Sequence, residues 1–180
     1  MNQKHQFTSL KSSLVAIAAS LILFVQSAHP STINNQRADS VLCLAKNIYW
    51  EARNQSYFGQ WAVGMVTMNR VEDNRFPNTV CEVVYEGLHR RSWKDSSVLV
   101  PIRDKCQFSW YCDGKSDKFP KHDEEAVMVA HEIANGILTT KYMDYTGGAV
   151  FYHADYVYPS WARQKEKTIE IDDHIFYKFK

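Results

Sequence analysis

The stretch that decides the fold is VLCLAKNIYWEAR, residues 41–53. Its apolar residues recur every three or four positions, as on the core-facing side of a helix. This row consists of Val41, Ala45, Ile48 and Ala52. A second row beside it, Leu44, Ile48 and Glu51, ends in a carboxylate. The spacing therefore predicts a helix that packs on the core and carries Glu51 at the edge of its buried face.

Glu51 is a candidate catalytic acid. Partial burial disfavours the anion of a carboxyl group and can raise its pKa from about 4.3 toward about 6, where a general acid works near neutral pH. The alternative is a solvated glutamate that pairs with Arg53 or another surface cation. The helical pattern alone leaves both interpretations open.

The N-terminal residues have the features of an export signal. Lys4, His5 and Lys11 precede an apolar stretch at residues 14–25, and small residues suited to signal peptidase follow. The stretch is shorter than the roughly 20 residues that a spanning helix needs. We therefore predict that residues 1–28 are a signal peptide, that the protein is periplasmic or secreted, and that no later segment is an integral membrane segment.

The charge balance does not favour nucleic acid as a partner. Removal of residues 1–28 takes away two of the 21 lysines and arginines and none of the 20 acidic residues, which leaves a formal charge near −1. The remaining chain is long enough for one domain with a substantial core. We expect a flexible polar lead-in at residues 29–38 and a single domain over residues 39–180.

Four cysteines behind an export signal favour disulfides over a zinc site or a thiol nucleophile. Three pairings of Cys43, Cys81, Cys106 and Cys112 are possible. We favour Cys106 with Cys112, which closes a tight loop, and Cys43 with Cys81, which ties the first helix to the segment after the second. Loop entropy gives about 2.5 kcal/mol for the short loop and about 4 kcal/mol for the long one.

The first half of the chain predicts helices. Asp39 or Ser40 could cap the first helix, and a second helix, apolar nearly all round, should span residues 59–71. A short helix is expected at residues 80–85, and another long one from residue 124 to about residue 138.

The C-terminal residues predict strands. Residues 148–153, 167–171 and 174–179 are rich in β-branched and aromatic side chains, and an acidic turn at Asp172-Asp173 separates the last two. Helices first and strands last indicate the α+β class, a helical core with a small C-terminal antiparallel sheet.

Between these parts, residues 87–120 show little periodicity and are interpreted as a long functional loop. Within it, residues 106–114 (CQFSWYCDG) combine amide, hydroxyl and aromatic groups that could line a sugar site. Further aromatic residues around Pro159 fit sheet packing and carbohydrate stacking equally well. They are Tyr152, Tyr156, Tyr158 and Trp161.

The sequence lacks the motifs that several other types of enzyme require. His131-Glu132 is not followed by the second histidine of a metallopeptidase helix, and the histidines show no ligand spacing, so no metal and no cofactor are expected. The sequence has no phosphate-binding glycine loop and no Gly-x-Ser-x-Gly motif. Ser109 is conceivable in a hydrolytic triad, but no spacing singles it out.

A series of short motifs runs through the chain. In order they are Ile48-Tyr49-Trp50-Glu51-Ala52-Arg53, Gly59-Gln60-Trp61-Ala62-Val63, Asn69-Arg70-Val71, Phe76-Pro77-Asn78-Thr79-Val80, Gln107-Phe108-Ser109, Thr146-Gly147-Gly148-Ala149 with Phe151-Tyr152, and His174-Ile175-Phe176-Tyr177. With these motifs in this order, the chain resembles the SleB-like cell wall hydrolase family, the spore cortex-lytic enzyme type, over roughly residues 41–177.

This resemblance implies a lysozyme-like catalytic domain that cleaves the β-1,4 bond between N-acetylmuramic acid and N-acetylglucosamine in peptidoglycan. Glu51 matches the family's catalytic glutamate. Members act mainly as lytic transglycosylases, in which one carboxyl serves as acid and then as base. Hydrolysis of the same bond is the second interpretation, because it needs another carboxylate about 5 to 9.5 Å away. Asp113 and Asp155 are unplaced candidates.

We further predict four residues that orient the sugar or stabilise the transition state, namely Gln107, Ser109, Tyr152 and His153. For each of them a scaffolding role is the alternative. A third interpretation of the whole chain is an inactive peptidoglycan-binding module that kept the fold. The sequence identifies no regulatory protein partner.

Overall fold

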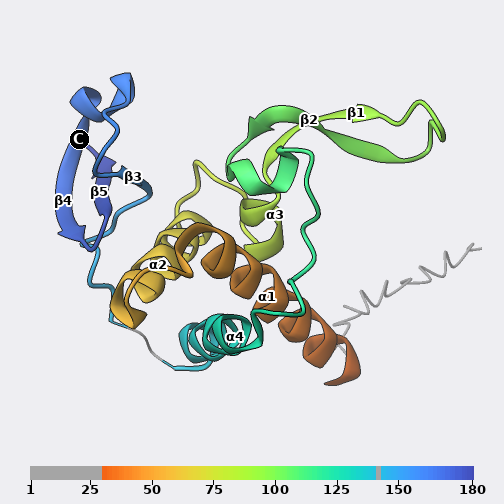
Figure 1. Ribbon diagram of the computed structural model, residues 1–180, viewed down its shortest axis with the longest axis horizontal. Coiled ribbons are helices and arrows are strands. Elements are labelled where there is room, and N and C mark those ends of the chain that lie inside the picture. The colour runs from red at the N-terminus through yellow and green to blue at the C-terminus, as the bar shows by residue number, and fades with distance from the viewer. Residues whose placement is uncertain (1–29, 141–142) are drawn as a thin grey trace, which may run out of the picture.

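The computed structural model of the protein describes residues 30–140 and 143–180, so the predicted signal peptide lies outside the described residues. Within them, a helical body is joined to a projecting two-stranded hairpin and to a separate three-stranded sheet (Figure 1). None of the helices in this part of the chain has the length and apolar character to cross a bilayer.

The helical body packs around α1 (Figure 1). Its helices are α1 (Pro30–Ala52), α2 (Tyr57–Glu72), the short α3 (Val80–Val84) and α4 (Glu124–Thr139). Leu44 and Ile48 of α1 are fully buried in one cluster with Ile133 and Ile137 of α4. Burial of each such side chain contributes about 1.5–3 kcal/mol relative to exposure. Of the predicted core-facing row, Ala45, Ile48 and Ala52 are buried and Val41 is partly buried against the same core, so this row is confirmed.

The start of α1 differs from the prediction. The helix begins at Pro30 and not at Asp39 or Ser40, so residues 30–38, expected as a lead-in, form its first turns. Residues 32 and 34–38 are exposed, so their polarity reflects a solvated helix face and not loss of helix. Pro30 suits the first position of a helix, and no glycine or proline follows it before the core-facing residues begin.

The C-terminal sheet agrees with the sequence patterns. It consists of β3 (Phe151–Ala154), β4 (Lys165–Ile171) and β5 (His174–Phe179), antiparallel in the order β3-β5-β4. The short 3₁₀ helix η2 (Ser160–Gln164) precedes β4. Phe176 of β5 is fully buried in a cluster with Ala52 and Val63, so the sheet covers the meeting point of α1 and α2. The α+β class is confirmed.

A turn in this sheet is bonded to the corner between α1 and α2. Oδ2 of Asp172, between β4 and β5, accepts hydrogen bonds from the backbone N and the hydroxyl of Ser56, at 2.9 and 2.6 Å. Ser56 also caps α2 through the backbone N of Gly59. Gln55 donates to Asp173 at 3.1 Å. These contacts fix the position of the sheet against the end of α1, where Glu51 lies.

The interpretation of residues 87–120 as one long loop is wrong in part. The segment contains a hairpin of β1 (Gly87–Arg91) and β2 (Leu99–Cys106), followed by the 3₁₀ helix η1 (Ser109–Cys112). Most hairpin residues are exposed, so no alternation of apolar and polar residues marked the strands.

Both favoured disulfides are present. Cys43–Cys81 joins α1 to α3, and Cys106–Cys112 joins the end of β2 to the end of η1. The second bond closes the short loop that carries Gln107 and Ser109.

Candidate functional site

Glu51 lies in the last turn of α1, where the helical body meets the C-terminal sheet. Its Oε2 accepts a hydrogen bond of 3.0 Å from the hydroxyl of Tyr152 on β3. Burial raises the pKa of Glu51 above its ordinary value, and the Tyr152 hydrogen bond and the positive charge of Arg70 offset part of this rise. The carboxyl group is thus held in surroundings that favour its protonated form.

Tyr152 is suited to remain a donor. Burial, together with the negative charge of Glu51, raises the pKa of Tyr152 well above its ordinary value. Its hydroxyl therefore keeps its proton, and it can hold the carboxylate form of Glu51 in place.

Among the described residues, Glu51 forms no ion pair with Arg53, the surface cation that the sequence offered as its partner. Arg53 instead lies 3.9 Å from Asp123, with its guanidinium over the rings of Tyr49 and Trp50. Glu51 has Tyr152 as its hydrogen-bond partner.

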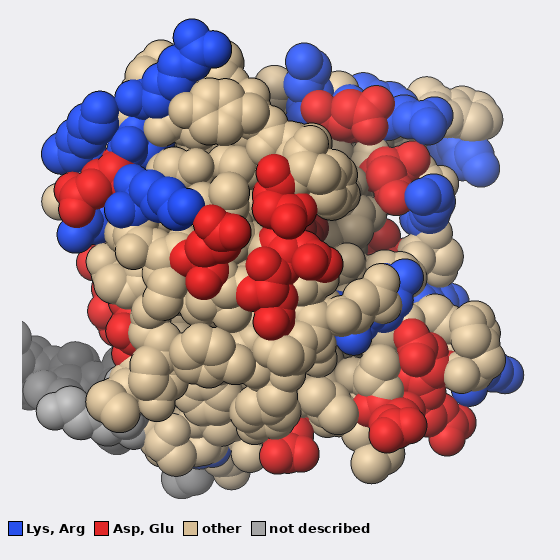
Figure 2. All heavy atoms as spheres, turned by 60° about the vertical axis from the view of Figure 1, so that its left-hand side comes forward, with Lys and Arg blue, Asp and Glu red and all other residues tan. Residues whose placement is uncertain are grey.

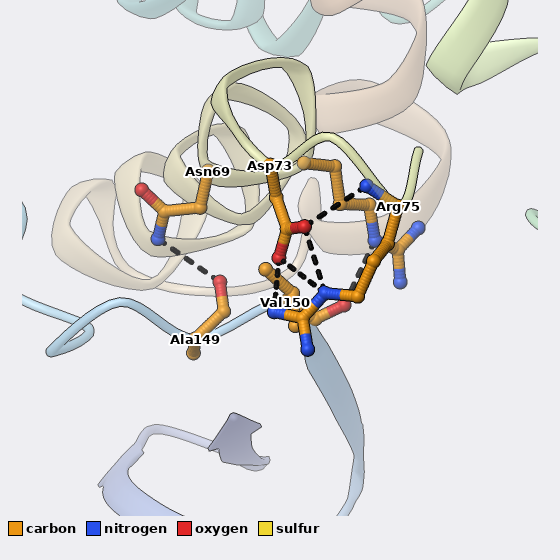
Figure 3. Close-up of polar contacts among 6 residues, drawn as sticks. Asn69, Asp73, Arg75, Ala149 and Val150 are labelled. Atoms are coloured by element: carbon orange, nitrogen blue, oxygen red, sulfur yellow. Dashed lines mark hydrogen bonds and ion pairs between the residues drawn. The ribbon is translucent and has the colours of Figure 1, made fainter. Parts of the chain in front are cut away.

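Arg70, near the end of α2, is a buried cation behind this pair and is only 2% exposed. Its Nε donates to the carbonyl oxygen of Val150 at 2.8 Å. The neighbouring Asn69 Nδ2 donates to Ala149 O at 2.9 Å (Figure 3). With its amide oxygen toward Arg70, Gln107 accepts from Nη1 and Nη2 at 3.3 and 3.2 Å. Arg70 therefore holds the start of β3 and one side chain of the site.

Two cavities flank the bonded pair. The first cavity, about 320 Å³, is lined by Trp50, Glu51, Ser109, Asp113, Lys115 and Asp117, among others. The second cavity, about 510 Å³, is lined by Arg70, Gln107, Phe151, Tyr152, Trp161, Gln164 and Lys165. Glu51 belongs to the first and Tyr152 to the second. A chain-like ligand that occupied both would pass the carboxyl group.

Three of the four residues predicted as sugar contacts line these cavities. Ser109 belongs to the first, and Gln107 and Tyr152 belong to the second. His153 is buried elsewhere: its Nδ1 contacts the carbonyl oxygen of Ala154, and its Nε2 contacts the hydroxyl of Tyr177 at 3.0 Å. It lines neither cavity, so its surroundings favour the scaffolding alternative.

Of the two candidates for a second carboxylate, Asp113 lies at the first cavity and Asp155 does not. Asp113 lines the first cavity and accepts a hydrogen bond of 2.8 Å from the backbone N of Lys115. Asp155 lies at the exposed end of β3, where its backbone N bonds to Asp173 O. Asp117, which sequence reasoning missed, also lines the first cavity, and burial raises its pKa.

Arg70 and Lys165 were also missed as members of the site. Arg70 gave one usable signal, a lone guanidinium in a helix that is otherwise apolar nearly all round. Lys165 gave none, because the sequence around it alternates charges as any exposed strand does. Among the described residues, no group of three or more His, Cys, Asp or Glu side chains is arranged to hold a metal ion.

Comparison with known proteins identifies a family to which the sequence is similar. Residues 54–177 match the family described as cell wall hydrolase, a range that begins just after Glu51. The spore cortex-lytic enzyme of Bacillus cereus is 28% identical over 146 residues, which is 81% of this chain and 46% of that protein. The enzyme of the same name from Bacillus subtilis is 40% identical over 62 residues, or 34% of this chain and 20% of that protein. The chain thus spans at most about half the length of these curated relatives.

Two solved structures agree with the fold. The catalytic domain of the Bacillus cereus SleB protein and that of a germination-specific lytic transglycosylase, SleB from Bacillus anthracis, are each 28% identical, with a TM-score of 0.54. The matches cover 78% of this chain and 91% and 94% of those chains. The predicted lysozyme-like arrangement, a helical core with a small antiparallel sheet, is confirmed.

Proposed function

Since the chain belongs to the cell wall hydrolase family, we propose that it cleaves the glycan strands of peptidoglycan at the β-1,4 bond between N-acetylmuramic acid and N-acetylglucosamine. The observation that carries the proposal is the partly buried carboxyl of Glu51, bonded to Tyr152 between two cavities. The likeness to a structure described as a lytic transglycosylase supports that reaction over hydrolysis.

In the first step Glu51 is the acid. Its protonated carboxyl donates the proton to the glycosidic oxygen as the bond from that oxygen to C1 of the muramoyl residue breaks. The N-acetylglucosamine side leaves with a 4-hydroxyl, and positive charge develops at C1. The raised pKa of Glu51 supplies the protonated form that this step consumes.

In the second step Glu51 is the base. Its carboxylate takes the proton of the muramoyl 6-hydroxyl as O6 bonds to C1 and closes a 1,6-anhydro ring. The carboxyl is then protonated again, and no water is consumed. The hydroxyl of Tyr152 and the charge of Arg70 favour the carboxylate between the two steps, since both lower the pKa of Glu51.

Hydrolysis of the same bond is the second candidate, and one observation favours it. Asp113 and Asp117 line the same cavity as Glu51, so a second carboxylate is available on that side. A hydrolase of this type would use one of them to activate water or to stabilise the sugar cation.

Digestion of purified peptidoglycan tests both candidates. We expect the protein to release muropeptides that end in 1,6-anhydro-muramic acid, seen by mass spectrometry as products one water lighter than reducing ends. Glu51→Gln should lower the rate about a hundredfold or more, because proton transfer from a positioned group typically contributes that much. The control, Glu125→Gln, removes an exposed carboxyl of α4 and should leave the rate unchanged.

The outcomes are distinct. Reducing ends would assign hydrolysis, and loss of activity in Asp113→Asn or Asp117→Asn would identify its second carboxylate. Equal rates for the protein and Glu51→Gln would reject Glu51 as the acid. Because the substrate lies outside the cytoplasmic membrane, we also propose that the protein is exported and acts in the periplasm or beyond. The N-terminal sequence of the mature protein tests this, with processing expected near Ala28.

A further inference from the structure

Lys165, the first residue of β4, stands at the second cavity with its charge directed over aromatic rings. Its ammonium nitrogen lies 4.4 Å from the ring centre of Phe151 and 3.8 Å from that of Phe179. Aromatic faces stabilise a cation but accept no conventional hydrogen bonds, so the ammonium protons still need acceptors.

The neighbouring lysines of the same sheet differ in this respect. Lys167 contacts Glu170 at 2.8 Å, and Lys178 contacts Glu166 at 3.3 Å. In the described part of the chain, Lys165 has no carboxylate within ion-pair distance. Figure 2, which brings the side of this sheet forward, shows Lys and Arg gathered at the upper left with some Asp or Glu among them, and a further group of Asp and Glu in the middle. Lys165 is thus a cation at a cavity without its own counter-ion.

The other lining residues suit a sugar. The rings of Phe151 and Trp161 offer flat apolar surfaces, and the amides of Gln107 and Gln164 offer donors and acceptors. The first cavity differs in charge, because three carboxyl groups, those of Glu51, Asp113 and Asp117, line it beside Arg53 and Lys115. The second cavity is lined by Arg70 and Lys165 and by no Asp or Glu, so a ligand with a negative substituent is favoured there.

We propose that the second cavity is a binding subsite for a carboxylate-bearing sugar, with Lys165 as the residue that recognises the carboxylate. The inference deepens the proposed function and rests on it. In peptidoglycan the acidic sugar is the muramoyl residue, whose carboxylate is either the free lactyl group of a bare strand or a carboxylate of an attached peptide. The strand then lies with the muramoyl residue of the cleaved bond in the second cavity and with the leaving N-acetylglucosamine toward the first.

Equilibrium binding to the Glu51→Gln protein tests the subsite without cleavage. The ligands are glycan fragments stripped of peptide, peptide-bearing fragments, and uncharged N-acetylglucosamine oligomers of the same length. Lys165→Met, added to Glu51→Gln, should weaken binding of at least one acidic ligand about fivefold, as for a partly exposed ion pair, and leave the neutral oligomer unaffected. The acidic ligand that responds identifies the source of the carboxylate.

Two further variants complete the experiment. Lys167→Met removes a charge from the same strand outside the cavity and should leave binding of every ligand unchanged, whereas Lys165→Arg should retain the preference for acidic ligands. Equal loss on acidic and neutral ligands, or no loss at all, would overturn the subsite. A parental protein that binds acidic ligands no better than neutral ones would overturn it as well. Failure of the proposed function appears separately, as absence of cleavage products from the protein with Glu51 intact.

Discussion

Tyr152 donates a hydrogen bond of 3.0 Å to Glu51, although 101 residues separate them in the chain. The acid belongs to the helical body and its donor to the C-terminal sheet, so the contact forms only when the two parts dock correctly. The pKa and the orientation of the Glu51 carboxyl therefore depend on how the helical body and the C-terminal sheet pack together, and substitutions in either part should alter them.

Tyr152→Phe removes the donor and keeps the ring. Since the Tyr152 hydrogen bond lowers the pKa of Glu51, its loss should raise that pKa further above its ordinary value. Glu51 then stays protonated to higher pH, and the alkaline limb of the pH profile of kcat/KM should move upward by about one unit or less. We also expect kcat to fall about tenfold, because the carboxylate loses a positioning contact. The control is Tyr177→Phe, whose hydroxyl contacts His153 in the same sheet. A downward shift of the limb would contradict the assignment.

Arg70→Met tests the buried cation. The substitution removes the donor to Val150 O and the donors to Gln107 while it fills a similar volume. Because a buried acceptor without its partner costs about 1–3 kcal/mol, the free energy of unfolding should fall by about that amount. Urea denaturation measures the change. Arg90→Met, on the exposed hairpin, should leave the midpoint unchanged, and an equally stable Arg70→Met would show that these hydrogen bonds do not support the fold.

Asp172→Ala tests the link between the sheet and the α1–α2 corner. The carboxylate accepts two hydrogen bonds from Ser56, so its loss should destabilise the protein by about 1 kcal/mol. It should also lower the cleavage rate, because β3 and Tyr152 lose part of their support. Asp172 has φ of +48°, and the exposed Asp104 has φ of +57°, so Asp104→Ala is a control for backbone strain alone. An activity loss of the same size in both variants would show that the hydrogen bonds between Asp172 and Ser56 do not support the cleavage site.

Reduction of the disulfides should lower the melting temperature, and the two bonds should contribute unequally. The chain-entropy relation gives about 4 kcal/mol for Cys43–Cys81, with a separation of 38 residues, and about 2.5 kcal/mol for Cys106–Cys112, with a separation of 6. Paired Cys→Ser variants, compared by thermal unfolding, should follow that order. An unchanged melting temperature in dithiothreitol would contradict a stabilising role for either bond.

The helical core could be predicted from sequence because its signal is local. Ile48 and Ala52 lie one turn apart, and this spacing alone predicts which face is buried. The hairpin gave no comparable signal. Both of its faces are largely exposed, so apolar and polar residues do not alternate along β1 and β2. Long-range polar contacts could not be predicted either. Arg70 donates to the carbonyl oxygen of Val150, 80 residues away, and no local pattern at either residue indicates that partner. Glu51 was found through its neighbours in the motif, whereas Lys165 emerges only once the cavity around it is seen.

The strand order β3-β5-β4 leaves β3 with β5 as its sheet neighbour, so Tyr152 obtains its place only after Phe176 and the rest of β5 have been synthesised. The ribosome makes Glu51 much earlier. A nascent polypeptide that stops short of β5 therefore carries Glu51 without its hydrogen-bond partner, and the environment that raises the pKa of Glu51 is complete only after the C-terminal sheet has been translated and has docked.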